Sequence, residues 1–275
     1  MPDVVHIAAP ADPRIVDYVG LTDPELRRRR ERSHGTEGGF FIAEGDVVIR
    51  RLVRSAFLVR SFLLTPGRWA ALGPELADVD APVHVATQPV MDAIAGFHLH
   101  RGALASVDRP PPADPAALAE AADLVVAVEG VNDHENLGAL FRNAAAFGAG
   151  AVILDPTTAD PFYRRAVRVS AGQVLHVPFG RVANWPDALT HLGNAGFEVL
   201  ALIPSPEALD LRAVASRPKQ AVVVGAEGPG LSAGALAAAD HRVRIAMAPG
   251  VDSLNVATAA AVALHHLARR RPSRR

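Results

Sequence analysis

After a proline-rich stretch near residue 110, the sequence alternates between short apolar segments rich in valine and isoleucine and longer segments with helical periodicity. Between residues 136 and 147, Leu137, Leu140, Phe141 and Ala144 recur at the spacing of one helix face. Strands that alternate with helices form a parallel sheet with helices on both faces, so the second half is expected to be an α/β domain. The expected strands are 124–128, 151–154, 174–177, 198–203, 221–224 and 243–246.

The clearest break in the chain is the segment 109–115, where Pro110, Pro111, Pro112 and Pro115 favour an extended linker over a helix or a central strand. Before it, a smaller α/β pattern has apolar segments at 40–42, 61–64, 83–86 and 102–107 and a helix at 46–55. The predicted division is a domain at 1–108, a linker at 109–119 and a second domain at 120–275.

Composition limits the classes of function. The chain is 49% hydrophobic and 21% charged, as in a soluble globular protein, and its lack of cysteine excludes thiolate catalysis and cysteine-bound zinc. No segment reaches membrane-spanning length and the start of the chain lacks a targeting pattern, so the expected location is the cytoplasm. A net charge of −1 argues against indiscriminate coating of nucleic acid, so any RNA contact must be local. A candidate basic patch, equally a solvated helix face, is Arg27, Arg28, Arg29, Arg30 and Arg32.

Three segments follow the ends of expected strands, where open α/β sheets bind ligands. In the first, 132–144, asparagine and aspartate suit a helix start, and Arg142 is either a phosphate clamp or a surface charge. The second, 222–232, turns from a strand into a helix through glycines and carries the acidic Glu227. It lacks the G-x-G-x-x-G order of dinucleotide folds and the ending of a P-loop, which disfavours a phosphate cradle and leaves a plain turn as the alternative.

The third segment, 245–256, passes from a strand end through Pro249 and Gly250 into an alanine-rich helix that continues to His266. Taken alone, it predicts that Ser253 is simply the N-cap of this helix.

Together, the three segments resemble in order and spacing the motifs of the SpoU/TrmH family, a branch of the SPOUT methyltransferases. Residues 123–268 carry the match, and residues 1–108 are more loosely similar to the substrate-binding domain of many members. Departures from the family pattern are His134, Ala246 and Ala257. The matching residues are Asn136, Gly138, Arg142 and Ala144; Gly225, Glu227, Gly230 and Leu231; Ile245, Met247, Gly250, Ser253, Leu254, Asn255 and Val256; and, in the first half, Phe41, Glu44, Gly45, His100, Arg101 and Gly102.

The resemblance implies that the second domain contains a deep trefoil knot, an exception to the rule against threaded chains, and binds S-adenosylmethionine. It implies two sets of site residues. The cofactor pocket would comprise Leu202, Gly225, Ile245, Met247, Leu254 and Asn255. The catalytic set would comprise Arg142, Asn136, Ser253, Asn255 and Glu227.

The function implied is transfer of a methyl group to a ribose 2′-hydroxyl of structured RNA, with ribosomal RNA favoured over transfer RNA. The first domain would bind the RNA, and a homodimer would complete the active site, without a metal ion or a membrane. Because a fold does not fix a function, the alternative is a non-catalytic RNA-binding or ribosome-assembly factor on the same fold.

Overall fold

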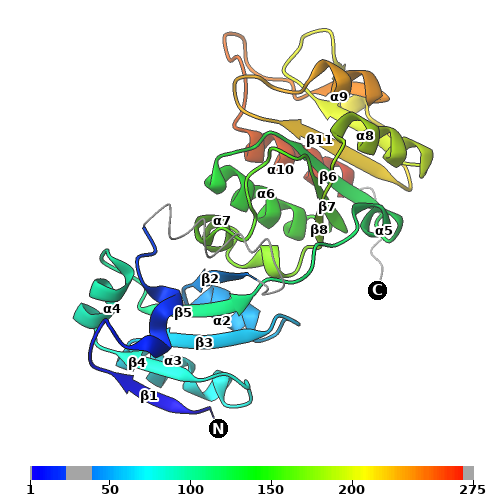
Figure 1. Ribbon diagram of the computed structural model, residues 1–275. Coiled ribbons are helices and arrows are strands. Elements are labelled where there is room, and N and C mark those ends of the chain that lie inside the picture. Colours follow the sequence, from blue (N-terminus) through cyan, green and yellow to red (C-terminus); the bar gives the residue numbers. More distant parts are fainter. Residues whose placement is uncertain (1, 23–38, 269–275) are drawn as a thin grey trace. The chain divides into compact units, whose positions relative to one another are not determined.

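The structure is a computed structural model that describes residues 2–22 and 39–268. The candidate basic patch at 27–32 therefore lies outside the described residues. The chain divides into two compact units (Figure 1). Unit 1 comprises Met1–Pro111 and Phe162–Leu175, and unit 2 comprises Pro112–Pro161 and His176–Arg275.

Unit 1 contains a five-stranded sheet in the order β1-β4-β3-β5-β2, in which β5 is antiparallel to its neighbours β3 and β2. The edge strand β1, which the sequence patterns did not indicate, pairs in parallel with β4. The elements from residues 1–111 are β1 Val4–Ile7, η1 Pro13–Tyr18, β2 Phe40–Glu44, α2 Asp46–Leu52, β3 Val59–Leu64, α3 Pro66–Leu76, β4 Val83–Ala86, α4 Gln88–Ala95 and β5 Ala103–Asp108.

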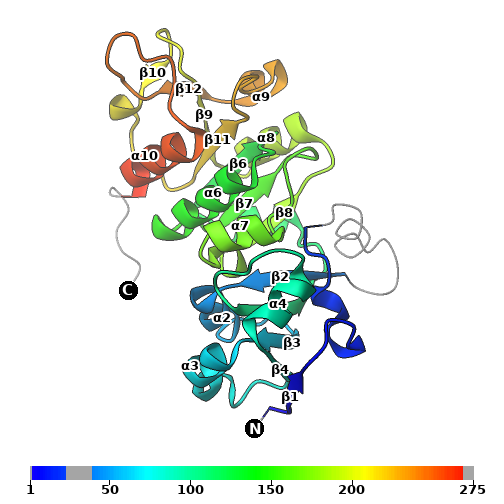
Figure 2. The ribbon, with the colours of Figure 1, turned by 90° about the vertical axis from the view of Figure 1, so that its left-hand side faces the viewer.

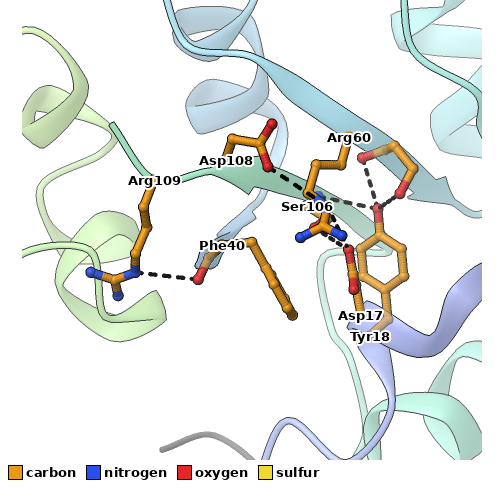
Figure 3. A network of polar contacts seen from close by, with 8 residues as sticks. Asp17, Tyr18, Phe40, Arg60, Ser106, Asp108 and Arg109 are labelled. Carbon is orange, nitrogen blue, oxygen red and sulfur yellow. Dashed lines mark hydrogen bonds and ion pairs between the residues drawn. The ribbon is translucent and has the colours of Figure 1, made fainter. Parts of the chain in front are cut away.

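A buried tyrosine fastens η1 to this sheet (Figure 3). The Tyr18 hydroxyl lies 2.7 Å from the Ser61 carbonyl oxygen, to which it donates, and it accepts from the Ser106 main-chain N–H at 3.1 Å. The Ser106 hydroxyl donates to Asp17 at 2.6 Å, and Asp17 also pairs with Arg60 at 3.3 Å. Burial raises the pKa of Tyr18, so its hydroxyl stays protonated and acts as a donor. These contacts make η1 part of the unit's core.

Residues from the second half of the sequence complete unit 1. The segment Phe162–Leu175 contains α7 Arg164–Val169 and the 3-10 turn η2 Gln173–Leu175. Phe162 stacks on Phe41 with ring centroids 4.6 Å apart, and Arg164 donates to the buried carboxylate of Glu44 at 2.5 Å. The sequence predicted a single boundary at the proline-rich linker 109–119, and it did not predict that the segment Phe162–Leu175 packs with the first half.

One expected strand is wrong. Residues 174–177 do not form a strand; Val174 and Leu175 lie in η2, and the strand β8 follows at Phe179–Arg181. The chain turns sharply just before this point, because Ala171 and Gly172 have φ angles of 53° and 81°. Val174 and Leu175 are nevertheless buried, which explains why their apolar side chains imitate a strand.

Unit 2 contains a seven-stranded sheet in the order β10-β12-β9-β11-β6-β7-β8, and every pair of neighbours in it is parallel. This confirms the α/β fold class with a parallel sheet, while the trefoil knot stays a prediction. The elements are α5 Pro115–Glu120, β6 Leu124–Glu129, α6 His134–Ala146, β7 Ala151–Leu154, β8 Phe179–Arg181, α8 Trp185–Asn194, β9 Glu198–Leu202, β10 Leu209–Asp210, η3 Leu211–Ala213, β11 Gln220–Gly225, α9 Ala233–Ala238, β12 His241–Arg244 and α10 Val256–Ala268.

Helices cover both faces of this sheet. Val125 and Ala127 of β6 belong to a core cluster with Trp185 and Leu189 of α8, so α5, α8 and α9 lie on one face. Helices α6 and α10 pack side by side, away from α8 and α9, in Figures 1 and 2. Alternate residues of the buried strands therefore serve two cores, as expected of a sheet covered on both sides.

Candidate active site

Three loops of unit 2 leave the carboxyl ends of strands β6, β11 and β12. We call 130–133, between β6 and α6, the first loop; 226–232, between β11 and α9, the second loop; and 245–255, between β12 and α10, the third loop. Because the strands are parallel, their carboxyl ends lie at one edge of the sheet. The three motif segments of the sequence therefore meet at this edge.

Asn255, at the end of the third loop, is the residue that joins them. Its Nδ2 donates to Oδ1 of Asn136 at 2.7 Å and to Oε1 of Glu227 at 2.8 Å. Its Oδ1 accepts from the main-chain N–H groups of Ala257 at 3.0 Å and Thr258 at 3.2 Å. The two N–H donors fix the amide orientation, because only the oxygen can accept from them. One side chain from each motif thus takes part in a single hydrogen-bonded cluster, Asn136, Glu227 and Asn255.

The same contacts correct the expectation for Ser253. The side-chain oxygen that accepts from the first turn of α10 belongs to Asn255, not to Ser253. Ser253 lies exposed in the third loop, two positions too early to reach these N–H groups. Ser253 is therefore not the N-cap of this helix.

The first loop delivers Asn136 through a capped helix start. Asp133 is the N-cap of α6, and its Oδ1 accepts from the main-chain N–H groups of Glu135 at 2.7 Å and Asn136 at 2.9 Å. One face of α6 is held against α10, because Asn143 Nδ2 donates to the Ala257 carbonyl at 2.8 Å. Asn136 lies on this face, almost two helical turns earlier. The helix thereby fixes the direction of the Asn136 side chain.

The second loop needs its glycines. Gly228 and Gly230 have φ angles of 93° and 70°, in the left-handed region that favours glycine. A Cβ atom on Gly225 would lie 2.5 Å from the carbonyl carbon and oxygen of Gly230, so the chain folds back on itself at that point. The Gly230 N–H donates to the Ala226 carbonyl at 3.0 Å and closes the turn. Glu227 sits within this turn, where its carboxylate reaches Asn255.

Two of the predicted catalytic residues stand apart from the cluster. Arg142 is exposed on α6, and among the described residues its guanidinium has no hydrogen bond or ion pair. Ser253 likewise has no hydrogen bond within the described part of the chain. Both side chains are accessible to a molecule outside this chain.

The predicted cofactor residues lie at the same edge of the sheet. Leu202 ends β9, Gly225 ends β11 and Ile245 follows β12, while Met247 and Leu254 lie in the third loop. These five residues are partly buried, so apolar surface is available at the ends of adjacent strands. Ile245 also lines a hollow of about 470 Å³, together with Asp210, Leu211, Arg212, Ala246, Val262, His265 and His266. The partly exposed apolar side chains suit a ligand that is held by shape, and the individual contacts stay predictions.

Sequence reasoning missed two carboxylates that support this edge. Oε2 of Glu129, the last residue of β6, accepts from the main-chain N–H of Ser232 at 3.0 Å, which ties the end of β6 to the second loop. Asp155 directly follows β7 and accepts from the main-chain N–H of Gly130 at 3.1 Å. Both acids stand at the carboxyl ends of expected strands, which is the signal that could have identified them.

Within residues 2–22 and 39–268, no cluster of three or more histidine, aspartate or glutamate side chains is arranged to hold a metal ion. In the same ranges, no helix combines the length and the apolar character needed to cross a membrane.

Comparisons with known proteins agree on one family. The profile of the SpoU rRNA Methylase family matches residues 123–265. An uncharacterised tRNA/rRNA methyltransferase of Mycobacterium tuberculosis is 45% identical over 270 residues, which is 97% of this chain and 92% of the relative. An uncharacterised tRNA/rRNA methyltransferase of Archaeoglobus fulgidus is 36% identical over 147 residues, covering 54% of this chain and 65% of that protein.

Solved structures show the same fold. An rRNA methyltransferase from Sinorhizobium meliloti, determined with bound AdoMet, superposes with a TM-score of 0.80 at 23% identity and covers 98% of this chain and 99% of that one. A protein described as an RNA 2′-O ribose methyltransferase gives a TM-score of 0.74 at 25% identity, over 97% of this chain and 98% of the other. From the profile match and the near full-length relative, we conclude that this chain belongs to the SpoU rRNA methylase family.

Proposed function

We propose that the chain transfers a methyl group from S-adenosylmethionine to a ribose 2′-hydroxyl of structured RNA, with ribosomal RNA favoured over transfer RNA. Family membership supports the coarser statement that it is an RNA methyltransferase. The observation that carries the proposal is the cluster of Asn136, Glu227 and Asn255, which brings one polar side chain from each of the three motif segments to one edge of the sheet. A site whose members bond to one another is preorganised for a reaction that depends on alignment.

The cofactor assignment rests on the partly exposed apolar residues at that edge. Leu202, Ile245, Met247 and Leu254 would contact it through shape, and Gly225 would let the second loop pass close by. S-adenosylmethionine supplies an activated methyl group when bound. A solved relative of the same fold carries AdoMet, which supports this choice for the present chain.

The protein's own task is to orient a weakly acidic hydroxyl in line with the methyl donor and to help remove its proton. A guanidinium offers five hydrogen-bond donors and no acceptor, so Arg142 suits positioning of a phosphate or hydroxyl better than proton removal. Its exposure and lack of a partner in the described chain leave all its donors available to RNA. Ser253, which is also exposed, would orient the ribose.

Two further parts of the proposal concern partners. Unit 1 would read the RNA, by shape and by exposed bases in loops, because A-form major grooves admit few side chains. A second copy of the chain would complete the site. Val251 in the third loop, Val262 on α10 and Leu209 on β10 are large apolar side chains left 49%, 40% and 40% exposed. Light scattering tests whether the chain forms a dimer. A monomer at assay concentration would contradict the proposal that a second copy completes the site.

Replacing Arg142 tests the proposed role of the guanidinium. We expect Arg142→Ala to lower kcat by about 100-fold, the cost of a small misplacement of the reacting groups. Calorimetry with S-adenosylmethionine should give an unchanged Kd, because Arg142 is not among the predicted cofactor residues. The substrate is total RNA from cells that lack this chain, and methyl incorporation is the readout.

Arg217→Ala is the matched control, since Arg217 is also exposed in unit 2 and, among the described residues, forms only a long ion pair of 3.8 Å with Glu198. It should keep normal turnover. Wild-type turnover in Arg142→Ala would exclude Arg142 from the site. Absence of S-adenosylmethionine binding by the unaltered protein would instead favour a non-catalytic RNA-binding factor.

A further inference from the structure

Asp155 is a buried carboxylate with its acceptor positions filled. Asp155 is only 4% exposed. Its Oδ1 accepts from the main-chain N–H groups of Gly130 at 3.1 Å and Thr158 at 2.7 Å. The hydroxyls of Thr157 and Thr158 also donate to it, the former at 2.6 Å. Burial alone would raise the pKa of Asp155, but these hydrogen bonds lower it below its usual value. The group is therefore an ionised acceptor at neutral pH.

The turn that begins with Asp155 is bonded to the main chain around the first loop at further points. We call residues 155–159 the brace. The Ala159 N–H donates to the Val131 carbonyl at 3.0 Å, and the Asp155 N–H donates to the Val128 carbonyl at 3.0 Å. With the bond from Gly130 to Asp155, the brace holds the end of β6 and the start of the first loop on both donor and acceptor sides.

The brace is itself held by Arg181, the last residue of β8. Its Nη1 donates to the Asp155 carbonyl at 2.6 Å and its Nη2 to the Ala159 carbonyl at 3.0 Å. One planar guanidinium thus spans both ends of the turn, which the single ammonium of a lysine cannot reproduce. Burial lowers the pKa of Arg181, against the opposing effect of Asp160 and Asp155. The guanidinium nevertheless stays charged at neutral pH.

The braced loop leads directly into the cluster. Gly130 has a φ angle of 68°, and a Cβ atom placed on it would lie 3.5 Å from Cβ of Ala226 in the second loop and 3.8 Å from the Thr157 hydroxyl. The first loop is therefore packed between the second loop and the brace. It ends at Asp133, which caps α6 and orients the N–H of Asn136.

We infer that Asp155 and Arg181 are positioning residues for the methyl transfer, because the brace holds the first loop in the place from which Asn136 bonds to Asn255. This inference rests on the proposed function. Neither residue touches the cluster; each acts through the main chain of residues 128–131.

The experiment compares Asp155→Ala, Asp155→Asn and Asp240→Ala in the full chain. Asn keeps an oxygen for the N–H groups of Gly130 and Thr158, so it should rescue most of what Ala loses. Asp240 is the control because it also accepts a main-chain N–H in unit 2, that of Val199 at 2.7 Å, but is not bonded to the first loop. Assays run well below each variant's Tm, with RNA from cells lacking this chain.

For Asp155→Ala we expect kcat to fall about 10- to 100-fold, the cost of a small misplacement of reacting groups, while the Kd for S-adenosylmethionine changes little. Asp155→Asn and Asp240→Ala should retain kcat within about threefold on the same reasoning. Arg181→Lys should resemble Asp155→Ala, because one ammonium cannot bridge both carbonyls. Wild-type kcat in Asp155→Ala, or an equal loss in Asp240→Ala, would overturn the inference.

Hydrogen exchange separates this inference from the proposed function, because it needs no activity. In Asp155→Ala, amides 128–137 should exchange faster than in the unaltered protein, while amides 220–225 of β11 keep their protection. Unchanged exchange at 128–137 would overturn the role of the brace even if the protein methylates RNA. Faster exchange in a protein that does not methylate RNA would count against the proposed function and leave the brace in place as a structural element.

Discussion

Asn255→Asp should abolish most methyl transfer while leaving the fold almost unchanged. The new carboxylate keeps an oxygen for the N–H groups of Ala257 and Thr258, so α10 stays capped. Its second oxygen replaces the Nδ2 donor, so Asn136 Oδ1 loses its hydrogen bond and the Glu227 carboxylate repels the new charge. We expect kcat to fall at least about 100-fold, from misplacement of the site residues.

The matched comparison is Asn255→Ala, which removes both the cluster contacts and the cap. It should lose activity to a similar degree and also cost about 1 kcal/mol of unfolding free energy, since capping residues are worth that much. Urea unfolding and a methylation assay on the same preparations separate the two effects. Near wild-type kcat for Asn255→Asp at neutral pH would show that the cluster has no part in the reaction.

Gly225→Ala should displace the main chain of the second loop. The added Cβ would lie 2.5 Å from the carbonyl carbon and oxygen of Gly230 and 2.7 Å from the nitrogen of Leu231. All of these are main-chain atoms, so the loop as a whole must shift. We expect a loss of about 1–3 kcal/mol of unfolding free energy, the usual range for overpacking, and at least about tenfold weaker S-adenosylmethionine binding.

Gly193→Ala is the control for this substitution. Gly193 lies in α8 of the same unit, and a Cβ atom there would meet nothing within 4 Å. Alanine favours a helix over glycine, so this variant should be stabilised by about 0.5–1 kcal/mol and bind S-adenosylmethionine normally. Calorimetry and thermal unfolding measure both quantities. If the two variants bind S-adenosylmethionine with the same Kd, Gly225 has no role in binding the cofactor.

Local patterns in the sequence predicted most of the second unit. Strand β7 at Ala151–Leu154 was expected at its observed limits, and β6, β9 and β11 to within a residue at either end, because buried parallel strands form short apolar runs between polar turns. The motif loops were located for the same reason: each follows such a strand. Of the predicted catalytic residues, Asn136 and Glu227 both bond to Asn255.

What the sequence could not supply are long-range contacts. The stacking of Phe162 on Phe41 and the ion pair of Arg164 with Glu44 join residues about 120 positions apart, and no local pattern encodes these contacts. The sequence predicted Ser253 as the N-cap of α10, but the capping side chain is that of Asn255. Serine and asparagine both cap helices, and only the position of the first helical turn distinguishes them. The edge strand β1 was missed because it has only four residues and its apolar Val4 lies on the exposed side, which hides the alternation in the sequence.

The most direct test of the central claim is the chemical identity of the product. The purified protein is incubated with isotopically labelled S-adenosylmethionine and RNA from cells that lack this chain, and the digested nucleosides are analysed by mass spectrometry. We predict that the label appears in a 2′-O-methylated nucleoside of ribosomal RNA and is lost with Asn255→Asp. Label on a base, or no label in any RNA from a protein that binds S-adenosylmethionine, would contradict the account.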